Sequence, residues 1–234
     1  MTPFLRGMVE ATVASFELPG PIAEIGSYQV PGQGQLGNLR QLFPDRPFVG
    51  MDMRPGPGVD LVENVESLSL ASETIGTVLA LSTLEHVRQF WKGIAEIKRV
   101  LRPDGVAILS APFYFHIHQH PIDYWRFTPE AWESLLEDHF PQRLLGYQGP
   151  AKRPSNTWVV AFGPEYPRLR DAQLEQYRKN ISALAKTPVR WGKLLRYRLG
   201  SFITGLRPFE AYLKRDHFQV ELRRNTIKAA SLAA

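Results

Sequence analysis

The stretch Ile22-Ala23-Glu24-Ile25-Gly26-Ser27 decides the fold, because it joins a short apolar run to a glycine turn at the start of a long alternating pattern. From residue 21 to residue 163, short apolar runs alternate with longer helical periods, as in a βα-alternating sheet domain. The pattern predicts an α/β fold with seven strands. They are expected at 22–25, 48–51, 59–62, 76–81, 105–110, 144–148 and 157–162.

Two helices are predicted between these strands. Residues 84–101 place apolar side chains three and four positions apart, which indicates an amphipathic helix that ends at Arg102-Pro103-Asp104-Gly105. Thr128 is a suitable N-cap and Pro129 suits the first helical position, so a second helix is expected to run through Leu136.

Composition excludes several classes of protein. The 234 residues contain no cysteine, so disulfides, thiolate zinc sites and cysteine nucleophiles are excluded. The first twenty residues lack the continuous apolar segment of a secretory signal, and no stretch is as apolar and long as a membrane-spanning helix. We therefore expect a cytoplasmic protein.

Charge divides the chain into two parts. Residues 1–165 hold 13 Lys/Arg and 18 Asp/Glu, a net charge of −5, whereas residues 166–234 hold 15 and 5, a net charge of +10. This distribution of charge is typical of a protein whose acidic body is catalytic and whose basic tail binds a partner or a surface. We expect a catalytic domain at 1–165 and a basic helical extension at 166–234.

The ends of the first two strands carry groups that suit a nucleoside ligand. Gly26 permits close backbone approach, and Asp52 places a carboxylate where a ribose diol could donate hydrogen bonds to it. The phosphate-binding pattern G-x-G-x-x-G is absent, which favours S-adenosylmethionine over NAD. A turn glycine and a solvated capping aspartate remain an equally open interpretation.

The motifs Glu24-Ile-Gly-Ser, Val49-Gly-Met-Asp52, Leu84-Glu-His-Val87, Arg99-Val-Leu-Arg-Pro-Asp-Gly105 and Pro121-Ile-Asp-Tyr-Trp-Arg-Phe-Thr-Pro129 occur in this order. Together they resemble the class I S-adenosylmethionine-dependent methyltransferases of the bacterial type-11-like family that is often associated with cell-surface glycan synthesis. The resemblance implies a Rossmann-like sheet of order 3-2-1-4-5-7-6 whose last strand is antiparallel.

The resemblance also implies a binding site for S-adenosyl-L-methionine. Glu24 and Gly26 would lie by the methionine part, Asp52 would bind the ribose and Met53 would pack on the adenine. Asn64 and Val65 would meet the adenine edge, and Ser27 and Ser82 complete the expected cofactor residues. Two positions depart from the family pattern, because Tyr28 replaces a glycine and Asn64 replaces an acid.

Three histidines stand close together in the segment 113–126: His116, His118 and His120. A metal site is the less favoured interpretation, because a proline follows at once and no carboxylate pattern accompanies them. We expect no metal, and we expect His118 to be the general base, with Asp123 as its orienting group or as an alternative base. The alternative is a packed aromatic lid with the histidines at its polar edge.

His86, Tyr124 and Arg126 are candidate substrate-binding residues. His86 follows the fourth strand, near the expected methyl group, although a histidine that caps local backbone would occupy the same place. Tyr124 and Arg126 could face a sugar by stacking and hydrogen bonding, while Trp125 is more simply explained as a packed residue.

These features predict transfer of a methyl group to a hydroxyl of a sugar or glycan intermediate. Another small-molecule acceptor, or a non-catalytic scaffold with this fold, remains open, and a nicotinamide oxidoreductase is a more distant alternative. Residues 186–215 mix aromatic, aliphatic and cationic side chains, which indicates either attachment to the inner face of a membrane or packing on the body or a second subunit. Nucleic acid is not expected as a partner.

Overall fold

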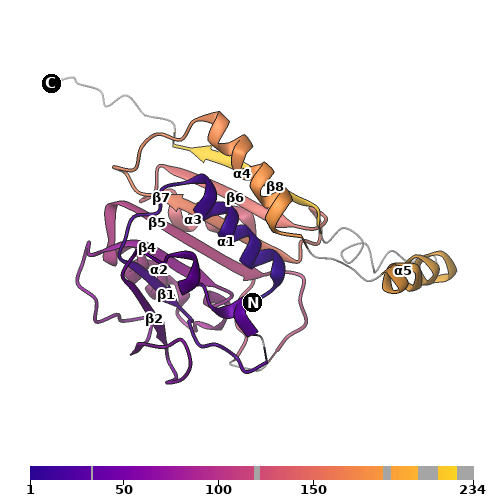
Figure 1. Ribbon diagram of the computed structural model, residues 1–234, viewed down its shortest axis with the longest axis horizontal. Helices are drawn as coiled ribbons and strands as arrows, with labels where there is room; N and C mark the ends of the chain where they lie inside the picture. Colours follow the sequence, from indigo (N-terminus) through magenta and orange to yellow (C-terminus); the bar gives the residue numbers. More distant parts are fainter. Residues whose placement is uncertain (33, 119–121, 187–190, 205–215, 226–234) are drawn as a thin grey trace.

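The structure is a computed structural model that describes residues 1–32, 34–118, 122–186, 191–204 and 216–225. Its centre is a single sheet of eight strands in the order β3-β2-β1-β4-β5-β7-β6-β8 (Figure 1). The predicted order is therefore confirmed, and β7 is antiparallel to both of its neighbours. The strands are β1 (Ile22–Ile25), β2 (Phe48–Asp52), β3 (Leu61–Val62), β4 (Ile75–Leu81), β5 (Leu101–Pro112), β6 (Gln142–Gln148), β7 (Asn156–Phe162) and β8 (Phe218–Arg224).

The helix predicted at 84–101 is divided in the structure. A 3-10 turn, η3 (Leu84–His86), is followed by α2 (Phe90–Val100), and the chain enters β5 at Leu101 without a separate terminating turn. The second predicted helix is confirmed as α3 (Pro129–Leu136), whose N-cap Thr128 accepts a hydrogen bond from the Ala131 N–H at 3.0 Å. The remaining helices are α1 (Pro3–Ser15), η1 (Gly34–Gly37), η2 (Arg40–Leu42), α4 (Asp171–Leu184) and α5 (Trp191–Thr204).

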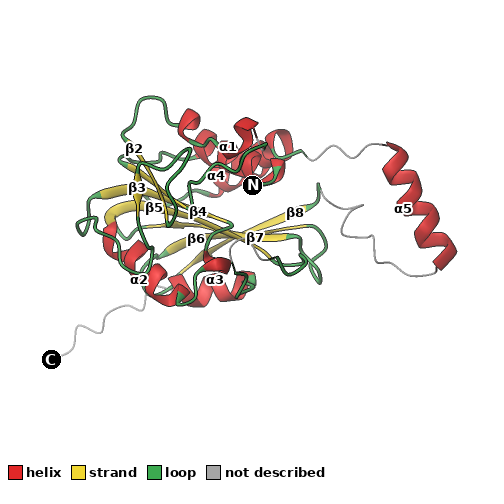
Figure 2. Cartoon of the chain, turned by 90° about the horizontal axis from the view of Figure 1, so that it is seen from below, coloured by secondary structure: helices red, strands yellow, loops and turns green. Residues whose placement is uncertain are grey.

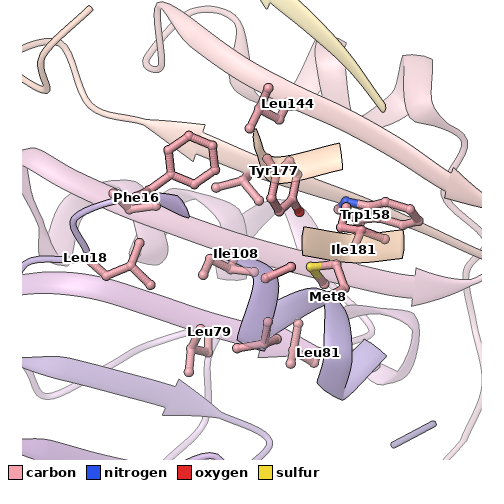
Figure 3. Close-up of a cluster of buried hydrophobic side chains, with 14 of the residues drawn as sticks. Met8, Phe16, Leu18, Leu79, Leu81, Ile108, Leu144, Trp158, Tyr177 and Ile181 are labelled. Carbon is pink, nitrogen blue, oxygen red and sulfur yellow. The ribbon is translucent and has the colours of Figure 1, made fainter. Parts of the chain in front are cut away.

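Helices α1 and α4 cover one face of the sheet, and α2 and α3 cover the other (Figure 2). The layer under α1 and α4 contains a large apolar cluster in which Met8 and Ile181 lie close to Trp158 of β7 (Figure 3). The two helices approach closely at Gly7, where an added Cβ would lie 2.4 Å from the carbonyl oxygen of Leu184. The first and fourth helices thus form one layer, although more than 150 residues separate them.

The layer under α2 and α3 faces the opposite side of the same strands. Trp132 is fully buried there, stacks on Phe127 at a centroid distance of 4.5 Å and donates from Nε1 to the hydroxyl of Thr157. Strand β4 lies between the two layers and is buried along its whole length. Burial on both faces explains why its sequence is continuously apolar.

The region after residue 165 contains more than helices. Strand β8 pairs antiparallel with β6 over residues 218–224, and Arg178 of α4 donates to the carbonyl of Val220 at 2.6 Å. Both α4 and β8 therefore pack on the sheet, which the sequence interpretation of a helical tail did not include. Division of the chain at residue 165 stays a prediction.

Helix α5 lies away from the sheet in both overall views (Figures 1 and 2). The rest of the predicted tail segment 186–215, apart from residue 186 and α5 itself, lies outside the described residues. In the part of the chain that is described, no helix is both long and apolar enough to cross a bilayer.

Candidate active site

The turn after β1 joins the ends of three strands. Gly26 has a φ of +82°, and its N–H donates to the carbonyl of Met51 at the end of β2. On the other side, Thr83 after β4 donates from Oγ1 to the carbonyl of Ile25 at 3.0 Å. These bonds hold the carboxyl ends of β1, β2 and β4 together, the edge at which open α/β sheets bind ligands.

Asp52 ends β2 and offers one free carboxylate oxygen. Its Oδ1 accepts from the Arg54 N–H at 3.0 Å, and the Arg54 guanidinium lies 3.6 Å away. Among the described residues, no donor bonds to Oδ2, and the side chain is 14% exposed. The carboxylate is therefore held in place with acceptor capacity left for a ligand.

Tyr28, which replaces the usual glycine, packs under the loop that follows β2. An added Cβ at Gly56 would lie 2.3 Å from its Cε2 atom, and the Arg54 guanidinium covers its ring at 4.6 Å. The tyrosine thus contacts the same arginine that neighbours Asp52.

Asn64, which replaces the usual acid of the family pattern, and its neighbour Val65 have different environments. Asn64 is exposed and its Oδ1 accepts from the Glu66 N–H at 3.0 Å, which is a local turn bond. Val65 is buried and packs against Gly93 of α2. Met53, by contrast, is 69% exposed, so its side chain is available to cover a flat ring.

Glu24, Ser27 and Ser82 line the same strand ends. Burial raises the pKa of Glu24 to about 8, partly offset by the positive charge of Arg40. Ser27 is buried and its hydroxyl has no hydrogen-bond partner among the described residues. Ser82 has a φ of +52°, which is unusual for a residue with a side chain and occurs often at functional sites.

His118 and Asp123 meet in the loop after β5. Nδ1 of His118 lies 2.9 Å from Oδ2 of Asp123, an ion-pair distance without the alignment of a good hydrogen bond. Asp123 is 1% exposed, and Arg126 binds both of its oxygens, with the Nη2–Oδ2 distance at 2.7 Å. The Arg126 guanidinium holds the pKa of Asp123 well below its usual range. The carboxylate is therefore ionised and fixed beside the imidazole.

His86 lies against His118, with ring centroids 4.8 Å apart. Its Nδ1 lies 3.0 Å from the carbonyl oxygen of Ile122, and a carbonyl only accepts, so the neutral ring carries its proton on Nδ1. Burial is the main cause that lowers the pKa of His86. The four residues His86, His118, Asp123 and Arg126, all predicted from sequence, are thus brought into one cluster.

Glu85 belongs to this cluster and was not predicted as a site residue. Its side chain is fully buried, neither carboxyl oxygen has a hydrogen-bond partner among the described residues, and Oε1 lies 3.7 Å from Nε2 of His86. Burial raises the pKa of Glu85 to about 8, which keeps it protonated at neutral pH. The one feature of the sequence that could have indicated a role for Glu85 was its place in the motif Leu84-Glu-His-Val87.

A pocket of about 540 Å³ lies next to the histidine cluster. The Tyr124 and Trp125 N–H groups donate to the carbonyl of Glu85 at 2.8 and 3.2 Å, which ties the pocket to the residue before His86. Trp91 is 51% exposed and its ring lies 6.3 Å from that of Trp125 at 75°. The lining residues are Arg88, Gln89, Trp91, Tyr124 and Trp125.

In the part of the chain that the structure describes, no set of three or more histidine and acidic side chains is arranged to hold a metal ion. The rings of His116 and His118 lie 6.3 Å apart. His120 lies outside the described residues.

Residues 33–109 match the family model described as a methyltransferase domain. Among solved structures, 1,6-didemethyltoxoflavin-N1-methyltransferase of Burkholderia thailandensis, with S-adenosylhomocysteine bound, is 18% identical with a TM-score of 0.51. The alignment covers 68% of this chain and 79% of that one.

A SAM-dependent methyltransferase of Thermotoga maritima, described as a possible histamine N-methyltransferase, is 15% identical with a TM-score of 0.50. Here the alignment covers 68% of this chain and 88% of the other. No curated protein matches the sequence. At these identities the solved structures establish the fold, which is that of the class I methyltransferases.

The fold and the domain match together define a SAM-dependent methyltransferase, with S-adenosyl-L-methionine as its cofactor. The residues present fit that cofactor. Asp52 keeps a free acceptor oxygen for a ribose diol, Met53 is exposed, and Ser27 has a buried hydroxyl that lacks a partner among the described residues. The particular residues that bind it remain a proposal.

Proposed function

We propose that the protein transfers the methyl group of S-adenosylmethionine to a hydroxyl of a sugar or glycan intermediate. The observation that carries the proposal is the buried, ionised Asp123 beside Nδ1 of His118. An imidazole with a carboxylate on one nitrogen is suited to accept a proton on the other. Hydroxyl acceptors need such a base, because their protons are not released at neutral pH.

The cofactor residues would be those at the ends of β1, β2 and β4. We assign the methionine part to Glu24, Gly26, Ser27 and Ser82, and the ribose to Asp52. Met53, Asn64 and Val65 would meet the adenine, where the amide of Asn64 can replace the usual acid as a hydrogen-bond acceptor. The bound cofactor supplies a methyl group that is attached to a sulfonium, and the rest of the cofactor leaves as a neutral thioether.

The protein has two tasks in this reaction: to align the acceptor oxygen and to remove its proton. The acceptor O–H would donate to Nε2 of His118 as the new O–C bond forms and the S–C bond breaks. The proton then resides on the imidazole, where Asp123 stabilises the positive charge, and Arg126 keeps Asp123 ionised. Neutral His86 would contact the acceptor beside it.

The aromatic pocket supports a sugar as the acceptor. Trp91, Tyr124 and Trp125 are partly exposed in it, and aromatic rings pack on the C–H faces of sugar rings. The guanidinium of Arg88 forms no ion pair with any described residue and could bind an acidic or phosphorylated group on the acceptor. Trp125, for which simple packing was the expectation, is 37% exposed and lines the pocket.

The test is turnover with defined acceptors. The protein is incubated with S-adenosylmethionine and separately with nucleoside-diphosphate sugars, small amines and small carboxylic acids, and S-adenosylhomocysteine is measured. We expect formation with a sugar hydroxyl, and a loss of about 10²–10⁴-fold in kcat for His118→Ala with unchanged cofactor affinity. His217→Ala, at an exposed histidine near β8, is the control.

Two results would count against the proposal. Turnover with an amine or an acid alone would mean that the acceptor class is wrong. Cofactor binding without turnover on any acceptor would instead favour a scaffold that has kept the fold.

A further inference from the structure

Helix α5 exposes its apolar side chains. Trp191, Phe202 and Ile203 are 79%, 88% and 78% exposed, so this side of α5 does not pack on the part of the chain that the structure describes. The exposed apolar residues recur three and four positions apart, so they form one stripe along the helix. This stripe, called the α5 stripe below, consists of Trp191, Leu195, Leu199, Phe202 and Ile203.

The same helix is cationic and contains no acid. Arg196 and Arg198 are exposed, and the sequence of α5 holds a third cation, Lys193, with no Asp or Glu between residues 191 and 204. At 100° per residue, Arg196 lies next to Ile203 and Arg198 next to Trp191, so the two arginines flank the α5 stripe on its two edges. Long cationic side chains in such positions can extend to a charged surface while the stripe is buried.

We propose that α5 binds in the plane of an anionic lipid bilayer, with the α5 stripe at the depth of the acyl chains and the arginines among the headgroups. Tryptophan at one end and phenylalanine near the other suit the boundary between headgroups and chains. The cations complement anionic headgroups, and each contributes about five-fold to the partition of the protein onto such a surface.

A lipid surface fits these observations better than a second copy of the chain. A stable dimer interface involves roughly 20–30 residues of each partner, whereas the whole of α5 has 14 residues and is about 21 Å long. A bilayer needs no matching pocket, since it adapts to the stripe. The inference does not depend on which acceptor the enzyme uses.

The test is co-sedimentation of the full chain with vesicles of phosphatidylcholine alone or with one quarter phosphatidylglycerol. We expect the protein to pellet with the anionic vesicles at low salt and to be released by high salt. Arg196→Gln with Arg198→Gln should weaken the binding about thirty-fold. Trp191→Ser with Phe202→Ser should weaken it at both salt concentrations.

The matched control is Lys92→Gln with Lys179→Gln, which removes the same charge from exposed positions of α2 and α4. These changes should leave vesicle binding within about two-fold of wild type. The proposal fails if the full chain stays in the supernatant, or if the α5 variants pellet like wild type. It also fails if light scattering shows that the protein is a dimer and that Trp191→Ser with Phe202→Ser dissociates this dimer. A full chain that binds an oligonucleotide through α5 but does not bind vesicles would contradict it as well.

Discussion

Thr83 occupies the space that a side chain at Gly26 would need: an added Cβ there would lie 2.2 Å from Oγ1 of Thr83. Because that hydroxyl also holds the carbonyl of Ile25, the threonine has little freedom to move away. The glycine is thus required by its neighbour as well as by its positive φ.

Gly26→Ala is expected to destabilise the fold and to weaken cofactor binding. The matched control is Gly32→Ala, where φ is +84° but nothing lies within 4 Å of the added Cβ. Gly32→Ala should cost about 1–2 kcal/mol from backbone strain alone, and Gly26→Ala should cost more. Urea unfolding of both variants measures the difference, which Thr83→Ala in the Gly26→Ala protein should reduce; equal costs for the two glycines would contradict the role of Thr83.

Asp52→Ala is expected to weaken S-adenosylmethionine binding by tens-fold or more. A charge-assisted hydrogen bond contributes ~1.5–3 kcal/mol, which corresponds to about 10–150-fold in affinity. Titration calorimetry gives the dissociation constants of the variant, of wild type and of the control Asp45→Ala, at an exposed carboxylate. If Asp52→Ala binds as tightly as wild type, the ribose lies elsewhere.

Glu85→Gln is expected to stabilise the protein more at pH 8 than at pH 5. At pH values between the ordinary pKa of 4.5 and the raised value of about 8, the Glu85 carboxyl has lost its proton in the unfolded chain but keeps it in the folded protein. Stability therefore falls as the pH rises through this window, and glutamine removes that cost.

The measurement is the Tm of both proteins from pH 4 to pH 9. Because burial also raises the pKa of Glu24, wild type and variant share that second contribution, and it cancels in their difference. Glu137→Gln, at an exposed carboxyl, should show no such trend. A difference in Tm between Glu85→Gln and wild type that stays constant over this range would show that Glu85 is already ionised.

Gly7→Ala is expected to destabilise the protein, although alanine ordinarily stabilises a helix interior by ~0.5–1 kcal/mol relative to glycine. The added Cβ would lie 2.4 Å from the carbonyl oxygen of Leu184, so α1 and α4 would have to separate. Overpacking of this kind costs about 1–3 kcal/mol. Gly192→Ala in α5, where nothing lies within 4 Å, should be neutral or stabilising by the same urea measurement.

Most of the sheet could be predicted from the sequence, because buried parallel strands leave continuous apolar runs between helical periods. Strand β8 was missed for a physical reason. Its apolar residues Phe218, Val220 and Leu222 alternate with polar ones, and only three such positions mark a strand in a region rich in helical spacing. Helix α1 was missed because burial extends around much of it, to Gly7 and Thr12 as well, so its sequence shows no clear apolar stripe.

Part of the candidate site could likewise be predicted from the sequence, and part could not. His118 and Asp123 lie in one loop, so their proximity could be predicted from sequence distance alone. The burial of Glu85 could not, because it depends on Tyr124 and Trp125 folding back onto its carbonyl from a distant loop. Trp91 stands in the apolar spacing of its helix and yet is 51% exposed and lines the pocket, which the spacing alone does not show.

Strand β8 gives the segment that contains α5 a fixed return point. The chain leaves the body at the end of α4 and comes back to it at residue 218, so α5 lies within an insertion that is anchored at both ends. The entropy of closing a loop grows only slowly with its length, by about 0.6 kcal/mol for each doubling. Such an insertion can be lengthened, shortened or exchanged with little effect on the sheet, so its sequence is free to evolve under a different selective pressure from that on the catalytic body.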